Sequence, residues 1–120
     1  MKIKKNILIV GGTGFIGSNL VQKATKLNYK VYSLSKNKYK KKINKVIYIT
    51  LDLKKKKKLF EAINSINFEY VIYSSGYIQH KDFNIEGFAY INENINNFNN
   101  LIETINLHHV KKFLNISSSD

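Results

Sequence analysis

Three glycines recur at steps of three near the start of the chain, within the string GGTGFIG at residues 11–17. In a turn between a strand and a helix, Gly11 permits a tight reversal, and Gly14 lets the backbone approach a diphosphate that a Cβ atom would push away. Gly17 lets the helix pack closely, and the helix N-terminus offers free N–H groups with a partial positive charge. The string therefore predicts a dinucleotide site. A tight turn without a ligand is the alternative, whereas a Walker-type phosphate loop is excluded because no Gly-Lys-Ser/Thr sequence follows.

The hydrophobic pattern predicts the elements that must position this loop. Short apolar or β-branched runs indicate strands, and apolar residues at steps of three and four indicate helices. In chain order we expect a strand at 3–10, a helix at 15–27, strands at 30–35 and 46–50, a helix at 54–66, a strand at 70–74, a helix at 88–107 and a strand at 112–116. This alternation predicts one α/β domain over residues 1–120, a Rossmann-type doubly wound parallel sheet with helices on both faces. The link at 36–45 lacks a helical pattern and is expected to be a solvated loop.

The chain is strongly basic. Its 20 basic residues are all lysine and stand against 8 acidic residues, which gives a formal net charge of +12. A protein that reads nucleic-acid sequence uses arginine for bidentate contacts to bases, and this chain has none. The lysines are also spread over loops and helix faces. We therefore expect no nucleic-acid partner, although the charge can steer anionic ligands toward the protein.

Several other classes of protein are disfavoured by the residue content. The absence of cysteine excludes disulfides and thiolate metal sites, and the three histidines lack convincing ligand spacing, so no metal site is expected. The apolar run at 7–10 is too short for a signal-peptide core or a membrane span. We therefore expect a cytoplasmic protein that does not associate with membranes.

The glycine string resembles the cofactor loop of the extended short-chain dehydrogenase family, which includes the NAD-dependent nucleotide-sugar epimerases and dehydratases. Four further passages are similar to this family: Asp52-Leu53 after the third strand, FEYVIYSSG at 68–76, Asn94 in the long helix and VKKFLNISSS at 110–119. The resemblance thus covers essentially the whole chain.

The resemblance implies a cofactor, a substrate and an assembly. The cofactor is NAD or NADP, the substrate of the full-length parent is a nucleotide sugar, and the helix at 88–107 takes part in a homodimer. By their match to the family's motifs, the cofactor-binding residues are Gly11, Thr13, Gly14, Phe15, Ile16, Gly17, Ser35, Lys36, Asp52, Leu53, Ser75, Gly76 and Asn94. The resemblance places residues 77–80 on the substrate side of the nicotinamide.

The end of the second strand bears on the choice between the two cofactors. NAD-preferring members usually carry an acidic residue there, which binds the ribose hydroxyls. This chain has Ser35 followed by Lys36. The missing carboxylate removes repulsion toward a 2′-phosphate, and the lysine can attract one, so we expect a preference for NADP. In the alternative interpretation, Lys36 is one more surface lysine.

The catalytic group of the family is only partly present in these 120 residues. The family uses a Ser or Thr after the fifth strand and a Tyr-x-x-x-Lys on the next helix. Ser118 matches the Ser/Thr position, with Ser119 as a close second, and no Tyr-x-x-x-Lys follows before Asp120. We therefore expect the cofactor-binding portion of an epimerase/dehydratase-type oxidoreductase that is inactive alone. A non-catalytic dinucleotide-binding module, or a degenerate remnant, is the alternative.

Overall fold

The computed structural model describes residues 4–39, 41–74, 87–105 and 109–116, and it describes their side chains except at 87–94. Five parallel strands form one sheet in the order β3-β2-β1-β4-β5. Their bounds are Asn6–Val10 for β1, Lys30–Ser35 for β2, Ile47–Thr50 for β3, Tyr70–Tyr73 for β4 and Lys112–Asn115 for β5. Strand β1 is central, and its last four residues are buried, which explains their uninterrupted apolar run.

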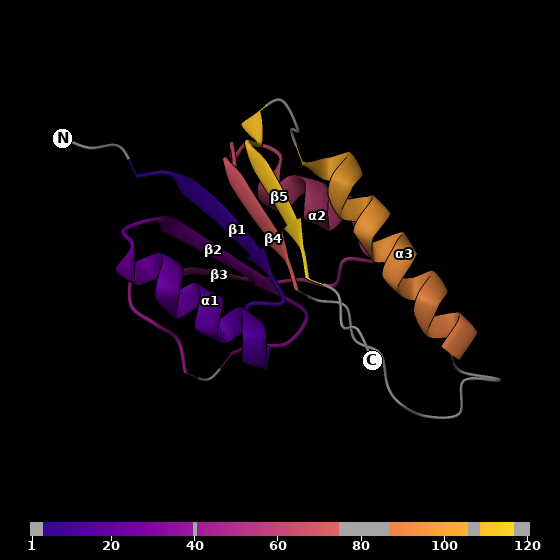
Figure 1. The fold of residues 1–120 in the computed structure, drawn as a ribbon. Helices are drawn as coiled ribbons and strands as arrows, with labels where there is room; N and C mark the ends of the chain where they lie inside the picture. The colour runs from indigo at the N-terminus through magenta and orange to yellow at the C-terminus, as the bar shows by residue number, and fades with distance from the viewer. Residues whose placement is uncertain (1–3, 40, 75–86, 106–108, 117–120) are drawn as a thin grey trace.

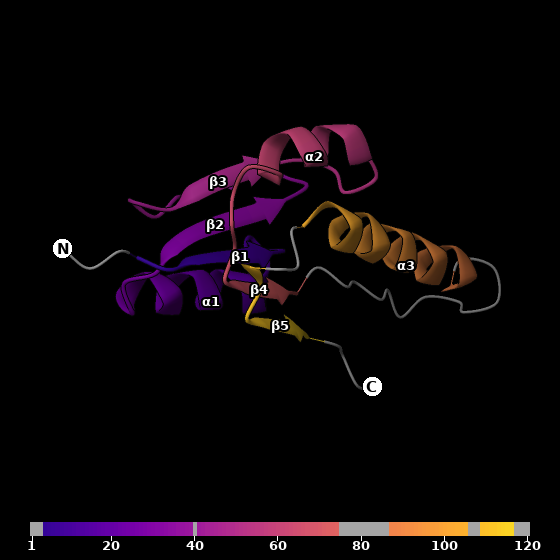
Figure 2. The ribbon, with the colours of Figure 1, turned by 90° about the horizontal axis from the view of Figure 1, so that it is seen from above.

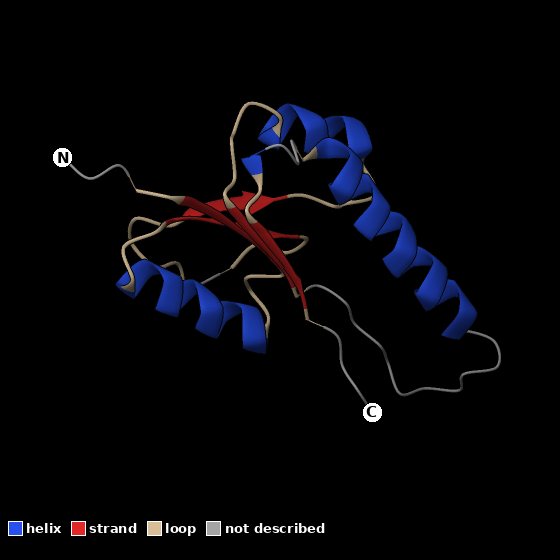
Figure 3. Ribbon diagram, turned by 45° about the horizontal axis from the view of Figure 1, so that its top comes forward, coloured by secondary structure: helices blue, strands red, loops and turns tan. Residues whose placement is uncertain are grey.

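Three helices cover the two faces of this sheet. Helix α1 spans Phe15–Lys26, α2 spans Lys56–Ile63 and α3 spans Gly87–Thr104. Figures 1 and 2 show α1 on one face and both α2 and α3 on the other. Figure 3 shows the same layers coloured by secondary structure. The predicted doubly wound parallel sheet is confirmed.

The reversal of strand order creates the place where ligands bind in open α/β sheets. The chain builds outward from β1 to β3 and then returns to place β4 on the other side of β1. All strands are parallel, so their carboxyl ends lie along one edge. In open α/β sheets with such a reversal, ligands bind at the carboxyl edge, at the point where the strand order changes direction.

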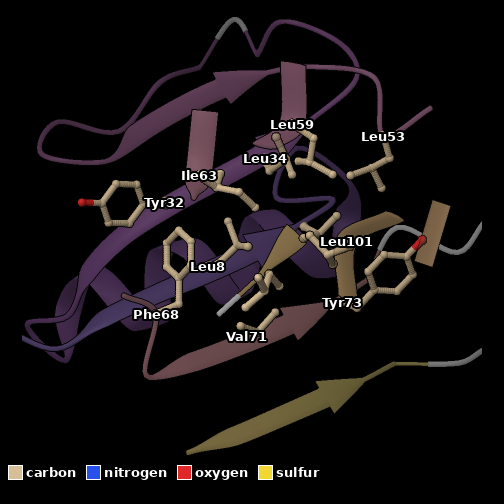
Figure 4. Close-up of a cluster of buried hydrophobic side chains, with 12 residues drawn as sticks. Leu8, Tyr32, Leu34, Leu53, Leu59, Ile63, Phe68, Val71, Tyr73 and Leu101 are labelled. Carbon is tan, nitrogen blue, oxygen red and sulfur yellow. The ribbon is translucent and has the colours of Figure 1, made fainter. Parts of the chain in front are cut away.

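The larger hydrophobic core lies between the sheet and helices α2 and α3, and Figure 4 shows its side chains. Leu8 and Leu34 of the strands meet Leu59 of α2 and Leu101 of α3, and each of the four is fully buried. Burial of one such leucine contributes about 1.5–3 kcal/mol. This core fixes α3 over the carboxyl edge of the sheet, where the predicted site lies.

The described strands and helices lie where the hydrophobic pattern predicts them. Most are shorter than predicted, but β2 has its predicted bounds and α3 begins one residue earlier, at 87. The clearest difference is α2, which occupies residues 56–63 rather than 54–66. Its start is delayed because Asp52 accepts a hydrogen bond from the backbone of Lys54 and forms a turn there. The described part of the β2–β3 link contains no helix, as expected.

Candidate functional site

The turn that leaves β1 requires glycine at its first position. Gly11 has φ 84°, in the left-handed region that side chains disfavour. Its N–H donates to the carbonyl of Leu34 on β2 at 2.7 Å, and its carbonyl accepts from Gly14 N–H at 3.1 Å. The reversal that was predicted for Gly11 is therefore present, with the turn held to the sheet on one side and to the start of α1 on the other.

Two further glycines of the loop are explained by close packing. A Cβ atom on Gly17 would lie 2.0 Å from the carbonyl oxygen of Gly11, so α1 can approach the turn only without a side chain there. A Cβ atom on Gly12 would lie 2.0 Å from Ser33 Oγ on β2. The sequence reasoning missed the role of Gly12. The sequence offered one signal for this role: a second glycine follows Gly11, and the neighbouring strand carries a small residue, Ser33.

Gly14 differs from these neighbours because the fold leaves its side-chain position open. The nearest atom to a Cβ there is the carbonyl oxygen of Gly11, at 3.5 Å, which is an ordinary contact. The φ of −76° also suits any residue. Among the described residues, no contact therefore requires glycine at this position.

The start of α1 beside Gly14 suits an anion. Gly14 is the N-cap and has no side chain to cap the first turn, and the first turn carries no acidic residue. The first N–H groups of a helix have no intrahelical partner, and they carry the positive end of the helix dipole. Phe15 and Ile16 follow with 87% and 51% of their surface exposed, which leaves apolar surface beside this anion site.

A small hollow of about 70 Å³ lies at the same edge of the sheet, at the carboxyl ends of β1, β2 and β3. It brings together four of the predicted cofactor residues with residues of the core and of α3. Its lining consists of Val10, Leu34, Ser35, Lys36, Leu51, Asp52, Leu53 and Asn97. The structure thus places Ser35 and Lys36, at the predicted ribose position, beside the predicted cofactor residues Asp52 and Leu53 and close to the end of β1.

Short-range contacts fix the polar groups of this hollow. Lys36 Nζ lies 3.9 Å from Asp52 Oδ2, with the lysine side chain 66% exposed and the aspartate 26% exposed. The other carboxylate oxygen of Asp52 accepts from Lys54 N–H at 3.0 Å. Ser35 Oγ donates to the carbonyl of Asn37 at 3.1 Å. The hollow therefore holds one half-buried carboxylate with a lysine ammonium at its rim.

Helix α3 supplies a residue that the sequence analysis did not select. The side-chain oxygen of Asn97 is buried and has no hydrogen-bond partner among the residues that the structure describes. One turn further on, Asn100 Nδ2 donates to the carbonyl of Leu53 at 2.9 Å and ties the helix to the loop after β3. Asn94 lies in the same helix, and its side chain is outside the described residues. Asparagines at 94, 97 and 100 share one helix face, a signal that the sequence contained.

The end of β4 is anchored to the start of the glycine turn. The hydroxyl and the N–H of Ser74 both donate to the carbonyl of Val10, at 2.8 and 2.9 Å. These two hydrogen bonds hold the end of β4 against β1, at the point where the strand order reverses. The expected cofactor residues Ser75 and Gly76, the substrate-side residues 77–80 and the catalytic Ser118 all lie outside the described residues.

A larger cavity of about 540 Å³ lies elsewhere, on the α1 face of the sheet. Its lining runs from the second half of α1 to β4 and β5 and is almost entirely apolar, with Lys23 and Lys112 among its residues. Among the described residues, none of the glycine turn and none of the predicted cofactor residues lines it. The smaller hollow is the one that contains predicted cofactor residues, and it is therefore the candidate site.

Comparison with known proteins agrees with this arrangement. The family model described as NAD dependent epimerase/dehydratase matches residues 7–120. A UDP-glucose 4-epimerase from Bifidobacterium longum, solved with NAD+ and UDP, superposes with a TM-score of 0.80 at 20% identity, over 96% of this chain and 37% of that one. The Thermus thermophilus UDP-glucose 4-epimerase, in complex with NAD, gives 0.78 at 22% identity over 90% and 36%. The L-threonine dehydrogenase from Clostridium difficile gives 0.75 at 24% identity over 98% and 37%.

These likenesses establish the fold and the family. The chain spans little more than a third of the length of the three solved relatives. A search of curated protein sequences found no significant match. Among the described residues, no helix has the length and apolar character needed to cross a membrane. The match to the family model over residues 7–120, together with the shared sheet topology, shows that this chain belongs to the NAD-dependent epimerase/dehydratase family.

Proposed function

We propose that this chain binds NAD or NADP and forms the cofactor-binding portion of an epimerase/dehydratase-type oxidoreductase. Gly14 is the observation that carries the proposal. The fold accepts a side chain there, yet the residue is glycine and stands at the uncapped N-terminus of α1. A diphosphate lying against this backbone accounts for the glycine, because the first Cβ atom would occupy the position of the ligand.

The residues described around Gly14 fit the diphosphate and the adenosine half of a dinucleotide. In the proposal, Gly11, Thr13, Gly14, Phe15, Ile16 and Gly17 surround the diphosphate. Ser35 and Lys36 lie at the adenosine ribose, and Asp52 and Leu53 at the adenine. The roles of Ser75, Gly76, Asn94 and Ser118 rest on the family's motifs alone. When bound, the nicotinamide supplies the hydride chemistry, and the chain holds and orients the cofactor.

Substrate and assembly follow from the family as proposals. The solved relatives include UDP-glucose 4-epimerases, one of them described in complex with UDP-glucose. We propose a nucleotide sugar as the substrate of the enzyme to which this portion belongs. A homodimer through α3 is proposed as well, supported by Ile95, an isoleucine of that helix with 52% of its surface exposed. A non-catalytic dinucleotide-binding role needs the same site and differs only in the absence of turnover.

The choice between NAD and NADP depends on Lys36. Three of the solved relatives are described with NAD or NAD+, which does not support the expected preference for NADP. Lys36 keeps its ammonium at the rim of the hollow, 3.9 Å from Asp52, and two-thirds exposed. An ammonium in this position can bind a 2′-phosphate only by sharing its charge with the carboxylate. Substitution of Lys36 therefore tests the preference between NAD and NADP directly.

Titration of the chain with NADH and with NADPH tests the proposal. We expect at least one of them to bind with a dissociation constant in the micromolar range, measured by calorimetry. If Lys36 contacts a 2′-phosphate, Lys36→Ala weakens NADPH about threefold to tenfold and leaves NADH unchanged. Lys38→Ala, at another exposed lysine, is the matched control. A folded chain that binds neither dinucleotide would overturn the proposed function.

A further inference from the structure

Asn97 presents a polar atom that forms no hydrogen bond with the described part of the chain. Its Oδ1 is buried without a hydrogen-bond partner, whereas buried side-chain oxygens in folded proteins nearly always have one. The amide lies on α3 and lines the hollow at the carboxyl edge of the sheet. A buried acceptor in the wall of a hollow can be satisfied by a donor that enters the hollow.

The other walls restrict what that donor can belong to. Val10, Leu34, Leu51 and Leu53 supply apolar surface on which a planar ring can lie. The Asp52 carboxylate also lines the hollow, and it accepts hydrogen bonds and donates none. The Ser35 hydroxyl already donates to the carbonyl of Asn37. The two acceptors, Asn97 Oδ1 and the Asp52 carboxylate, therefore favour a ring that carries N–H donors.

The rim of the hollow disfavours cationic ligands. Lys36 holds its ammonium 3.9 Å from Asp52 and already supplies a positive charge there. A second cation would meet this ammonium at close range. A neutral ring with an exocyclic amine matches the apolar walls, the two acceptors and the rim at once.

We propose that Asn97 is a specificity-determining residue for the base, whose carbonyl oxygen accepts a hydrogen bond from the exocyclic amine of adenine. The inference rests on the proposed function, because it assigns the adenosine half of the dinucleotide to this hollow. It adds a residue on α3 to the two on the β3 side, Asp52 and Leu53. Helix α3 thereby becomes part of the base-binding wall.

The bond from Asn100 to the carbonyl of Leu53 supports this role. It joins α3 to the loop that carries the Asp52 carboxylate, with an Nδ2-to-oxygen distance of 2.9 Å. Asn97 lies one turn before Asn100 on the same face of the helix. The two acceptors that would contact the base are therefore held at a fixed separation by the structure.

The test compares two dinucleotides that differ only at the base, NADH and its analogue with hypoxanthine in place of adenine, or the corresponding NADPH pair if the chain prefers NADPH. Hypoxanthine replaces the exocyclic amine by a carbonyl oxygen, which cannot donate to Asn97, and its added N1–H lies at a different position on the ring. Calorimetric titration of the wild-type chain should show tighter binding of the adenine form. Asn97→Leu should reduce this preference about fivefold, mainly through weaker binding of the adenine form.

The controls separate recognition from folding. Asn99→Leu changes an exposed asparagine of the same helix and should leave both affinities unchanged. The melting temperature of Asn97→Leu should equal or exceed that of the wild type, because the substitution removes an unpaired buried oxygen. If the leucine does not fit, Asn97→Ala gives the same comparison.

The outcomes distinguish this inference from the proposed function. A wild-type chain that binds the dinucleotide, with an unchanged adenine preference in both Asn97 variants, overturns the role of Asn97 alone. A wild-type chain that binds no dinucleotide overturns the proposed function and this inference with it. A fivefold loss of preference in the Asn97 variants, with Asn99→Leu unchanged, supports the assignment.

Discussion

The glycines of the turn are explained by different physical constraints. Gly11 is required by its backbone angle, and Gly12 and Gly17 by the atoms that a Cβ would meet. Gly14 has neither constraint. Three of the four glycines are therefore explained by the fold, and the proposed diphosphate accounts for the fourth, Gly14.

Gly12→Ala tests the first group. The added methyl group would meet Ser33 Oγ at 2.0 Å and a methyl group of Val21 at 3.1 Å, in a buried position. We expect a loss of about 2 kcal/mol in the free energy of unfolding, measured by denaturant titration, because overpacked sites shift their neighbours. Gly14→Ala is the matched control and should change stability by less than about 0.5 kcal/mol. Equal effects of the two substitutions would contradict the assignment.

The residues of the candidate site were predictable from the sequence to different degrees. The roles of Gly11 and Gly17 follow from their spacing, since a strand, a turn and a helix leave few alternatives. Asn97 was not predictable, because an asparagine on an otherwise amphipathic helix usually faces solvent. Its burial depends on where α3 crosses the sheet, which local sequence does not determine. Gly12 was missed for the same reason, since its contact is with a different strand.

At the scale of elements, α3 is the helix that completes the site. It packs through Leu101 and Ile105 into the core and covers the carboxyl edge of the sheet. Two polar links join it to its surroundings: Lys56 of α2 pairs with Glu103, and Asn100 donates to Leu53. The exposed ion pair contributes little, and the half-buried hydrogen bond contributes about 1 kcal/mol.

Asn100→Ala should therefore destabilise the chain by about 1 kcal/mol relative to Asn99→Ala, measured by thermal or denaturant unfolding. Both substitutions make the same change in helix propensity, so their difference reports the bond to Leu53. Asn99 is exposed and provides the reference. If the two variants have the same stability, the contact does not hold α3 to the loop after β3.

The elements themselves were largely predictable. Each strand carries a short apolar run and each helix an apolar stripe, so element type and order follow from periodicity. The ends were less predictable because they depend on local hydrogen bonds, such as the Asp52 turn that delays α2. The strand order follows from chain geometry, since parallel crossovers are nearly always right-handed.

At the scale of the whole molecule, the two hollows differ in chemistry as well as in size. The larger one is lined mainly by apolar side chains on the α1 face, whereas the smaller one, the proposed site, is lined by the Asp52 carboxylate and by Asn97, whose side-chain oxygen has no partner among the described residues. The net charge of +12 adds a long-range attraction for an anionic dinucleotide at low salt. This attraction is screened beyond about 8 Å at physiological ionic strength, so contacts at the site must provide selectivity.

The central claim is that a diphosphate lies against the backbone at Gly14, and calorimetric titration of Gly14→Ala with the preferred dinucleotide tests it most directly. The fold accepts the methyl group, so the melting temperature should stay within about 2 °C of the wild type. The affinity should fall by at least about tenfold, because the new Cβ occupies the place of the phosphates. Unchanged affinity in this folded variant would contradict the account.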